Sequence, residues 1–140
     1  MSQVIVTQLR VRYAETDAMG VLHHSVWPVY WELGRTDLLR AVYRPYAEIE
    51  AEGILFPLVD YGVRMDQPAH YDDTIEIRTR LTELGRVRLR FDYEGWRGEE
   101  RLATGHTVHG VIDRDWRVCR LPAELAAALR KALTPAEVNA

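Results

Sequence analysis

The amino-acid sequence predicts a single α+β domain in which one long helix covers an antiparallel β-sheet. Two patterns support this fold class. Apolar residues recur at helical spacing through residues 25–43, the longest helical pattern in the 140 residues. From residue 54 onward, short segments alternate apolar and charged residues and are separated by turn residues. The chain shows no internal repeat and no linker, so we assign residues 1–140 to one domain.

The first part of the chain predicts a strand, a polar loop and then the long helix. Residues 4–13 alternate as a half-buried strand does, and the alternation ends at Ala14. Ser25 is a residue type that caps helices, and Pro28 suits a first helical turn. Gly34 lies in the middle of the apolar helix face, which predicts that the helix backbone lies close against the sheet. That face comprises Trp27, Tyr30, Trp31, Gly34, Leu38, Ala41 and Val42.

The rest of the chain predicts strands joined by tight turns. Pro45 and Gly53 bound a short helix at residues 46–52. Gly85 is expected to take the left-handed position of a three-residue hairpin loop. The expected strands are residues 54–66, the segment from 72 to the hairpin, residues 87–94 and residues 102–112, followed by a helix at 123–133 and a frayed tail at 134–140.

Composition and charge exclude several classes of protein. With 47% hydrophobic and 28% charged residues, the chain can bury a core. A net charge of −3 argues against a nucleic-acid partner. No apolar run approaches membrane-spanning length and residues 1–4 open no signal peptide, so we expect no membrane span. The lone Cys119 cannot form an internal disulfide, which favours a reducing compartment, and we expect a cytoplasmic protein.

The loop between the first strand and the long helix is the candidate catalytic segment. It places Asp17 close to the helix N-terminus, where unpaired backbone N–H groups and the positive end of the helix dipole lie. Gly20 lets the loop turn through a conformation that a β-carbon resists. A loop aspartate before a helix is more often a cap or turn residue, so both interpretations stay open on this pattern alone.

The histidines do not predict a metal site. His23 and His24 are adjacent, and the side chains of neighbouring residues diverge. His106 and His109 are separated by an odd number of positions, so a strand would point them to opposite faces. No cysteine and histidine pattern has zinc spacing. We therefore expect neither a metal nor a redox cofactor.

Short motifs spread through the chain resemble one enzyme family. The motifs are Val11-Arg12-Tyr13, Thr16-Asp17, Gly20-Val21, His24, Trp27, Tyr30-Trp31-Glu32, Arg35, Pro68-Ala69 and Tyr71-Asp72-Asp73. Together they resemble the acyl-CoA thioesterases of the hotdog fold, in the branch of 4-hydroxybenzoyl-CoA thioesterase and its Tol–Pal-associated relatives. The resemblance covers residues 9–122. Glu15, His23 and Trp27 depart from the residues that are common in that family, which bears on substrate preference.

The resemblance implies a hotdog fold, in which a curved sheet wraps the long helix, and the hydrolysis of an acyl- or aryl-CoA thioester to the free acid and coenzyme A. Asp17 would act as the nucleophile or as the general base, and the backbone N–H of His24, in the loop that Gly20 turns, would bind the oxyanion. Coenzyme A would be part of the substrate and not a cofactor. The expected substrate-binding residues are Tyr13, Val21, His23, Trp27, Tyr30, Glu32, Arg88 and Arg90.

Several alternatives stay open. Arg88 and Arg90 lie on a charged strand face that is either solvated or binds coenzyme A phosphates. Glu32 and Arg35, one turn apart on the polar side of the helix, form a surface pair, or, as the resemblance implies, Glu32 lies near the pocket or the subunit interface. Asp17 with His23 or His24 would also suit an acyl-thioester hydratase or dehydratase, and a non-catalytic acyl-binding protein is a further alternative. Because sites in the resembled family form between subunits, we expect at least a homodimer, with a homotetramer plausible.

Overall fold

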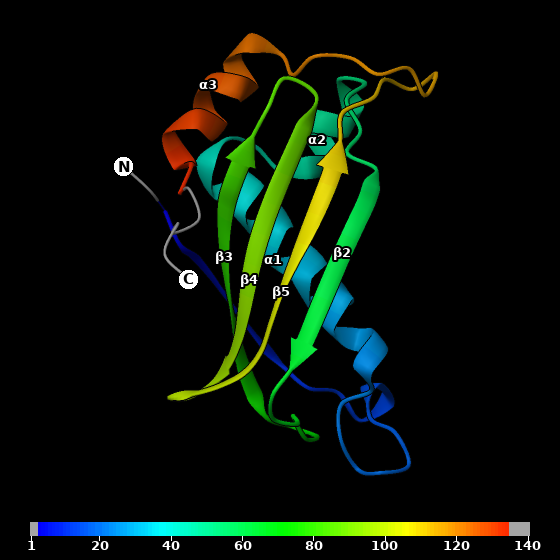
Figure 1. The fold of residues 1–140 in the computed structure, drawn as a ribbon, viewed down its shortest axis with the longest axis vertical. Helices are drawn as coiled ribbons and strands as arrows, with labels where there is room; N and C mark the ends of the chain where they lie inside the picture. Colours follow the sequence, from blue (N-terminus) through cyan, green and yellow to red (C-terminus); the bar gives the residue numbers. More distant parts are fainter. Residues whose placement is uncertain (1–2, 135–140) are drawn as a thin grey trace.

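In the computed structural model, which describes residues 3–134, one antiparallel sheet of five strands is crossed on one face by a long helix (Figure 1). The strand order is β1-β3-β4-β5-β2, which leaves β1 and β2 at the edges. The predicted α+β fold class is confirmed. The elements are β1 Ile5–Arg10, α1 Trp27–Val42, α2 Tyr46–Ala51, β2 Leu58–Met65, β3 Thr74–Leu84, β4 Arg88–Arg97, β5 Glu100–Gly110 and α3 Ala123–Ala132, with 3-10 turns η1 Tyr13–Glu15 and η2 His24–Val26.

The core lies between the inner face of the sheet and α1. Alternate residues of β3 and β4 are buried, as the alternation of apolar and charged residues predicts. Near the C-terminal end of α1 the buried face differs from the predicted one. Leu39 is buried beside Leu38, whereas Ala41, which was predicted to face the core, is exposed. The main buried side chains of this layer are Trp27, Trp31, Leu38, Ile75, Ile77, Leu81, Leu89, Phe91 and Tyr93.

Three glycines let α1 lie directly on the sheet. A β-carbon at Gly34 would come under 3.0 Å from Oγ1 of Thr79 on β3. On the sheet side, β-carbons at Gly95 and Gly105 would meet the rings of Trp27 and Trp31 under 3.0 Å. The prediction that the Gly34 backbone approaches the sheet is therefore confirmed, and flat indole rings fill the space over the two strand glycines.

Four local predictions are wrong. Ser25 does not cap the long helix: the N-cap of α1 is Val26, without a side-chain hydrogen bond, and Ser25 lies inside η2, where its N–H donates to the side chain of the N-cap His23. Gly85 does not take the left-handed conformation, because its φ is not positive; its N–H donates to the Arg88 carbonyl at 2.8 Å and closes the turn. The strand expected at residues 54–66 begins only at Leu58. Thr134 is not frayed, because its N–H donates to the Leu81 carbonyl at 2.7 Å; the rest of the predicted tail lies outside the described residues.

Within residues 3–134, no helix is long and apolar enough to cross a lipid bilayer. The longest, α1, has 16 residues and carries a charged outer side.

Candidate active site

The loop before α1 is a closed hairpin whose turn presents Asp17. The Asp17 N–H donates to the Val21 carbonyl and the Gly20 N–H donates to the Asp17 carbonyl, each at 2.9 Å. Gly20 has a φ of +81°, the conformation for which the sequence predicted a glycine. One carboxylate oxygen of Asp17, Oδ1, accepts the Met19 N–H at 2.9 Å. Among residues 3–134 no donor binds the other oxygen, Oδ2, which leaves it available to a reactant or a water.

Asp17 lies in a cleft of about 240 Å³ at one end of the sheet. One wall is the loop and the start of α1, and the other is the connection that follows β2. The Leu22 N–H donates to the Ala69 carbonyl at 2.8 Å, which ties the two walls together. The lining residues are Asp17, Met19, Val21, Leu22, His24, Trp27, Met65, Asp66, Gln67, Pro68 and Ala69.

The approach to α1 places a backbone donor beside this cleft. His23 is the N-cap of η2: its Nδ1 accepts the Ser25 N–H at 3.2 Å, so this nitrogen carries no hydrogen in that arrangement. The His24 ring stacks on the His23 ring with the centroids 4.1 Å apart. The His24 N–H has no acceptor among the residues that the structure describes. A free N–H just before a helix N-terminus is a donor suited to a developing oxyanion.

Glu15 and Tyr30 hold the loop from behind. The Tyr30 hydroxyl and the Arg12 N–H both donate to Oε1 of Glu15 at 2.8 Å. Burial alone would raise the pKa of Glu15, whose side chain is 10% exposed, but these hydrogen bonds and the Arg12 guanidinium outweigh it and lower the pKa. The pKa of Tyr30 is raised by burial and by the Glu15 carboxylate. Sequence reasoning missed this support because the partners are 15 residues apart.

The structure brings part of the predicted site together within this chain. Asp17, Val21, His24 and Trp27 line one cleft, and Gly20 turns the loop that carries it. His23 lies next to the cleft as the cap of η2.

Other predicted substrate-binding residues lie away from this cleft. Tyr13 is 76% exposed and packs edge-on against Tyr71, with the ring centroids 5.5 Å apart. Arg88 begins β4, at the end of the sheet opposite the Asp17 loop (Figure 1). Arg90 donates to Asp92 at 3.1 and 3.2 Å on the outer sheet face. Within this chain, therefore, neither arginine lies beside Asp17, and their assignment to coenzyme A phosphates stays a prediction.

Two of the remaining residues are held by other contacts. Tyr30 is buried with its hydroxyl on Glu15, outside the Asp17 cleft. Glu32 pairs with Arg35 at 3.6 Å on the side of α1 that faces α2, and it lines a different cavity.

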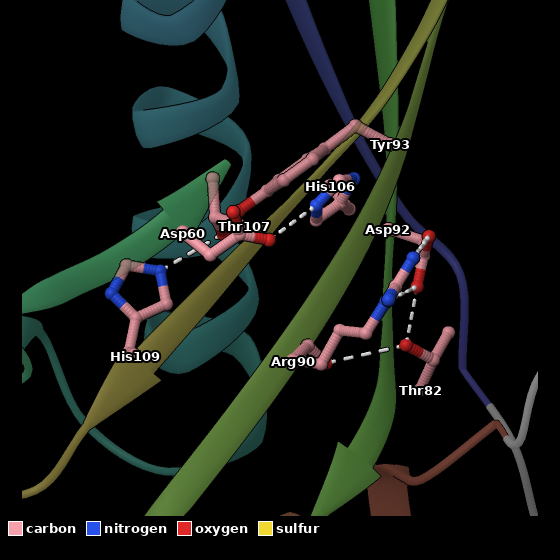
Figure 2. A network of polar contacts seen from close by, with 8 residues as sticks. All are labelled: Asp60, Thr82, Arg90, Asp92, Tyr93, His106, Thr107 and His109. Atoms are coloured by element: carbon pink, nitrogen blue, oxygen red, sulfur yellow. Dashed lines mark hydrogen bonds and ion pairs between the residues drawn. The ribbon is translucent and has the colours of Figure 1, made fainter. Parts of the chain in front are cut away.

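Histidines on β5 belong to polar contacts on both sheet faces (Figure 2). His106 contacts Asp60 at 2.9 Å on the outer face, and His109 contacts Thr107 at 2.9 Å inside. The two histidines thus have different surroundings, as their odd spacing predicted. Within residues 3–134, no group of three histidine, cysteine, aspartate or glutamate side chains is arranged to hold a metal ion.

The fold, a five-stranded antiparallel sheet crossed by one long helix, is that of a thioesterase family. The model of the thioesterase-like superfamily matches residues 11–129, most of the chain, and the protein belongs to this family. The predicted family and its hotdog fold are therefore confirmed.

Three relatives illustrate the similarity. A hypothetical protein of Thermus thermophilus, TT1821, is 41% identical, with a TM-score of 0.90 over 94% of this chain and 99% of that chain. The structure described as DHNA-CoA thioesterase of Staphylococcus aureus is 28% identical, with a TM-score of 0.88 over 91% of this chain and 89% of that chain. The acyl-CoA thioester hydrolase YbgC of Escherichia coli O6:H1 is 34% identical over 83 residues, which are 59% of this chain and 62% of the relative.

Proposed function

We propose that the protein hydrolyses an acyl- or aryl-CoA thioester to the free acid and coenzyme A. The single observation that carries the proposal is the Asp17 cleft, which combines a carboxylate oxygen and the His24 N–H, both without a hydrogen-bond partner among residues 3–134. Relatives named for thioester hydrolysis, among them YbgC, support the same reaction, and the family makes the chain a thioester hydrolase.

The proposed reaction begins with the thioester carbonyl oxygen on the His24 N–H. In one route, Oδ2 of Asp17 attacks the carbonyl carbon, coenzyme A leaves as the thiolate, and water hydrolyses the resulting anhydride. In the other route, Asp17 takes a proton from a water that attacks the same carbon, the C–S bond then breaks, and coenzyme A leaves as the thiolate and takes up the proton. The Met19 N–H fixes the carboxylate through Oδ1 in both routes. The geometry of the loop is compatible with either role.

The remaining parts of the proposal follow from this chemistry. A carboxylate, an oxyanion donor and water suffice, so we propose that the reaction uses no metal or redox cofactor. The proposed partner is an acyl-CoA and not a nucleic acid. We also keep the cytoplasm as the proposed location, because Cys119 is a single cysteine without an internal partner.

We propose that two chains associate through β2. This strand is an edge of the sheet, and a free edge of eight residues is a template for pairing with another chain. Its exposed apolar side chains are Leu58, Val59, Tyr61 and Met65. Antiparallel pairing about a two-fold axis would set the Leu58 end of one strand against the Met65 end of the other. A tetramer built from such dimers remains part of the proposal.

One observation favours a second candidate function. His24 lines the same cleft as Asp17, so the pair could act as acid and base in the hydration of a 2-enoyl thioester. A non-catalytic acyl-binding protein is the third possibility.

A panel of acyl-CoAs distinguishes the three functions. We expect release of free thiol from at least one acyl- or aryl-CoA, with no change in the absorbance of a 2-enoyl-CoA beyond that of hydrolysis. Loss of enoyl absorbance without thiol release would support the hydratase. Binding of acyl-CoA without either signal would support the non-catalytic protein.

A further inference from the structure

A second cavity, of about 300 Å³, lies at the other end of β2 from the Asp17 cleft and shares no lining residue with it. It is enclosed by the polar side of α1, by α2, by the segment before β2 and by the inner side of β4 and β5. Its volume is at the lower end of the range for small-molecule sites. The lining residues are Glu32, Arg35, Thr36, Leu39, Tyr46, Glu50, Phe56, Phe91 and His109.

Arg35 gives this cavity a positive charge whose hydrogen-bond donors are only partly used within the protein. The side chain is 18% exposed, and within residues 3–134 its ion pair is with Glu32 at 3.6 Å, longer than a good hydrogen bond. Glu32 is 63% exposed, so its carboxylate is largely solvated. A guanidinium has five N–H donors in a planar fork that matches a carboxylate. The Tyr93 hydroxyl also lies close enough to accept a hydrogen bond from the Arg35 side chain. With five N–H donors and only these two partners among the described residues, the guanidinium still has donors available for a ligand.

His109, which lines the cavity, begins a chain of neutral hydrogen bonds that runs into the core (Figure 2). Nδ1 of His109 faces the Phe56 carbonyl at 3.2 Å, so it donates, and Nε2 then accepts from the Thr107 hydroxyl at 2.9 Å. Thr107 in turn accepts from the Tyr93 hydroxyl at 2.6 Å. Burial and the nearby charge of Arg35 lower the pKa of His109 to about 4, so the ring is neutral near pH 7. Arg35 is thus the cation of this cavity.

We propose that this cavity is a binding site for a carboxylate, with Arg35 holding the carboxylate and the side chains of Leu39, Phe56 and Phe91 contacting the carbon chain. The rim carboxylates of Glu32 and Glu50 oppose an anion, but both residues are exposed and screened by water, whereas Arg35 lies inside. A bidentate contact to the guanidinium is stronger than the long pair that it replaces.

The carboxylate has two possible sources. It is either a free carboxylic acid or the far end of an acyl group attached to coenzyme A, and the second case rests on the proposed function. Phe56 lies two residues before β2, and the Asp17 cleft includes Met65 at the other end of that strand. The two-fold pairing of β2 would therefore bring this cavity close to the cleft of the partner, where an acyl chain begins.

Calorimetric titration with hexanoate and with hexanol tests the site without any turnover. We expect hexanoate to bind at least tenfold more tightly than hexanol. Arg35→Gln should abolish this preference, and Arg40→Gln, a change at an exposed arginine of the same helix, should retain it. Glu32→Gln removes the competing carboxylate and should tighten hexanoate binding severalfold.

Equal binding of hexanoate and hexanol, binding of neither, or an unchanged preference in Arg35→Gln would overturn the proposal. If Arg35→Gln does not fold, the two titrations of the unmodified protein and of Glu32→Gln decide the question.

Hydrolysis of adipoyl-CoA and hexanoyl-CoA distinguishes the two sources. If the far end of the acyl group is bound, Arg35→Gln lowers the ratio of kcat/KM for adipoyl-CoA to that for hexanoyl-CoA by at least tenfold. An unchanged ratio with hexanoate binding intact assigns the cavity to a free acid. If no acyl-CoA is hydrolysed, the proposed function fails, while the titrations still support or overturn the carboxylate site.

Discussion

Replacing Gly34 with alanine tests how closely α1 lies on the sheet. The new β-carbon would lie well under 3.0 Å from Oγ1 of Thr79 and 3.0 Å from Cγ2 of Ile77, so the helix or these buried side chains must move. Alanine gains about 1 kcal/mol of helix propensity over glycine. Overpacking a closed core costs about 1–3 kcal/mol. We expect Gly34→Ala to lower the free energy of unfolding by about 1 kcal/mol, and Gly34→Leu to lower it further.

Thr79 supplies the matched control for this prediction. Its hydroxyl is buried and has no hydrogen-bond partner among the described residues, so Thr79→Ala removes the clashing atom without breaking a bond. In a double-mutant cycle, Gly34→Ala should cost about 1 kcal/mol less in the Thr79→Ala background. The assay is urea unfolding at one fixed protein concentration, because association would also stabilise the fold. Additive effects, or a Gly34→Leu variant as stable as the parent, would refute the close contact.

Two further predictions concern the support of the loop and the sheet edge. Tyr30→Phe removes the hydroxyl that donates to Glu15, and we expect the free energy of unfolding at pH 7 to fall by about 1.5–3 kcal/mol. Because the folded pKa of Glu15 lies below 4.5, this stabilisation is present above pH 4.5 and is lost as the pH falls through the lowered folded pKa. Urea unfolding of variant and parent should therefore converge in acid, and a constant difference would contradict the contact. At the β2 edge, Val59→Lys should increase the monomer fraction in light scattering, and a fully active monomer of the parent protein would rule out a shared site.

The sheet and the long helix could be predicted because their signals are local. Ile75 and Ile77 alternate with charged residues along β3, and this period alone determines which side faces the core. Gly34 in an apolar helix face indicated a close neighbour, although only the structure identifies Thr79 as that neighbour. The acid-bearing loop was found through its motif and through its position before a helix.

The parts that could not be predicted depend on residues far apart in the chain. Ser25 and His23 can both accept a hydrogen bond at a helix start. In the structure the His23 N–H donates to the Glu15 carbonyl, and this path of the loop makes His23 the cap of η2. The cavity beside Arg35 is lined by residues from five segments of the chain, so no local sequence pattern predicts it. The Thr134 N–H is held by Leu81, a partner on β3 that the sequence near the C-terminus does not reveal.

The central claim is that the negative charge of Asp17 carries the hydrolytic step. Asp17→Asn keeps the size of the side chain and an Oδ1 that can still accept the Met19 N–H, but it removes both a nucleophile and a base. A general base alone contributes about 10²–10⁴-fold to the rate. Glu15 is unsuitable as a control because its carboxylate holds the loop. Asp66→Asn is the matched control, since this second carboxylate lines the same cleft and is also engaged by Arg64 at 3.2 Å.

The most direct measurement is single-turnover hydrolysis of a thioester substrate by Asp17→Asn, beside a melting curve and the titration of a non-hydrolysable analogue. We expect the rate to fall by about 10²-fold or more, with the melting temperature and the analogue affinity close to those of the parent, and with a much smaller loss in Asp66→Asn. A variant that retains more than about a tenth of the parent rate, far above the loss expected for a missing base, would contradict the claim. A rate that falls only because the protein melts or no longer binds the analogue would make Asp17 a structural residue of the turn.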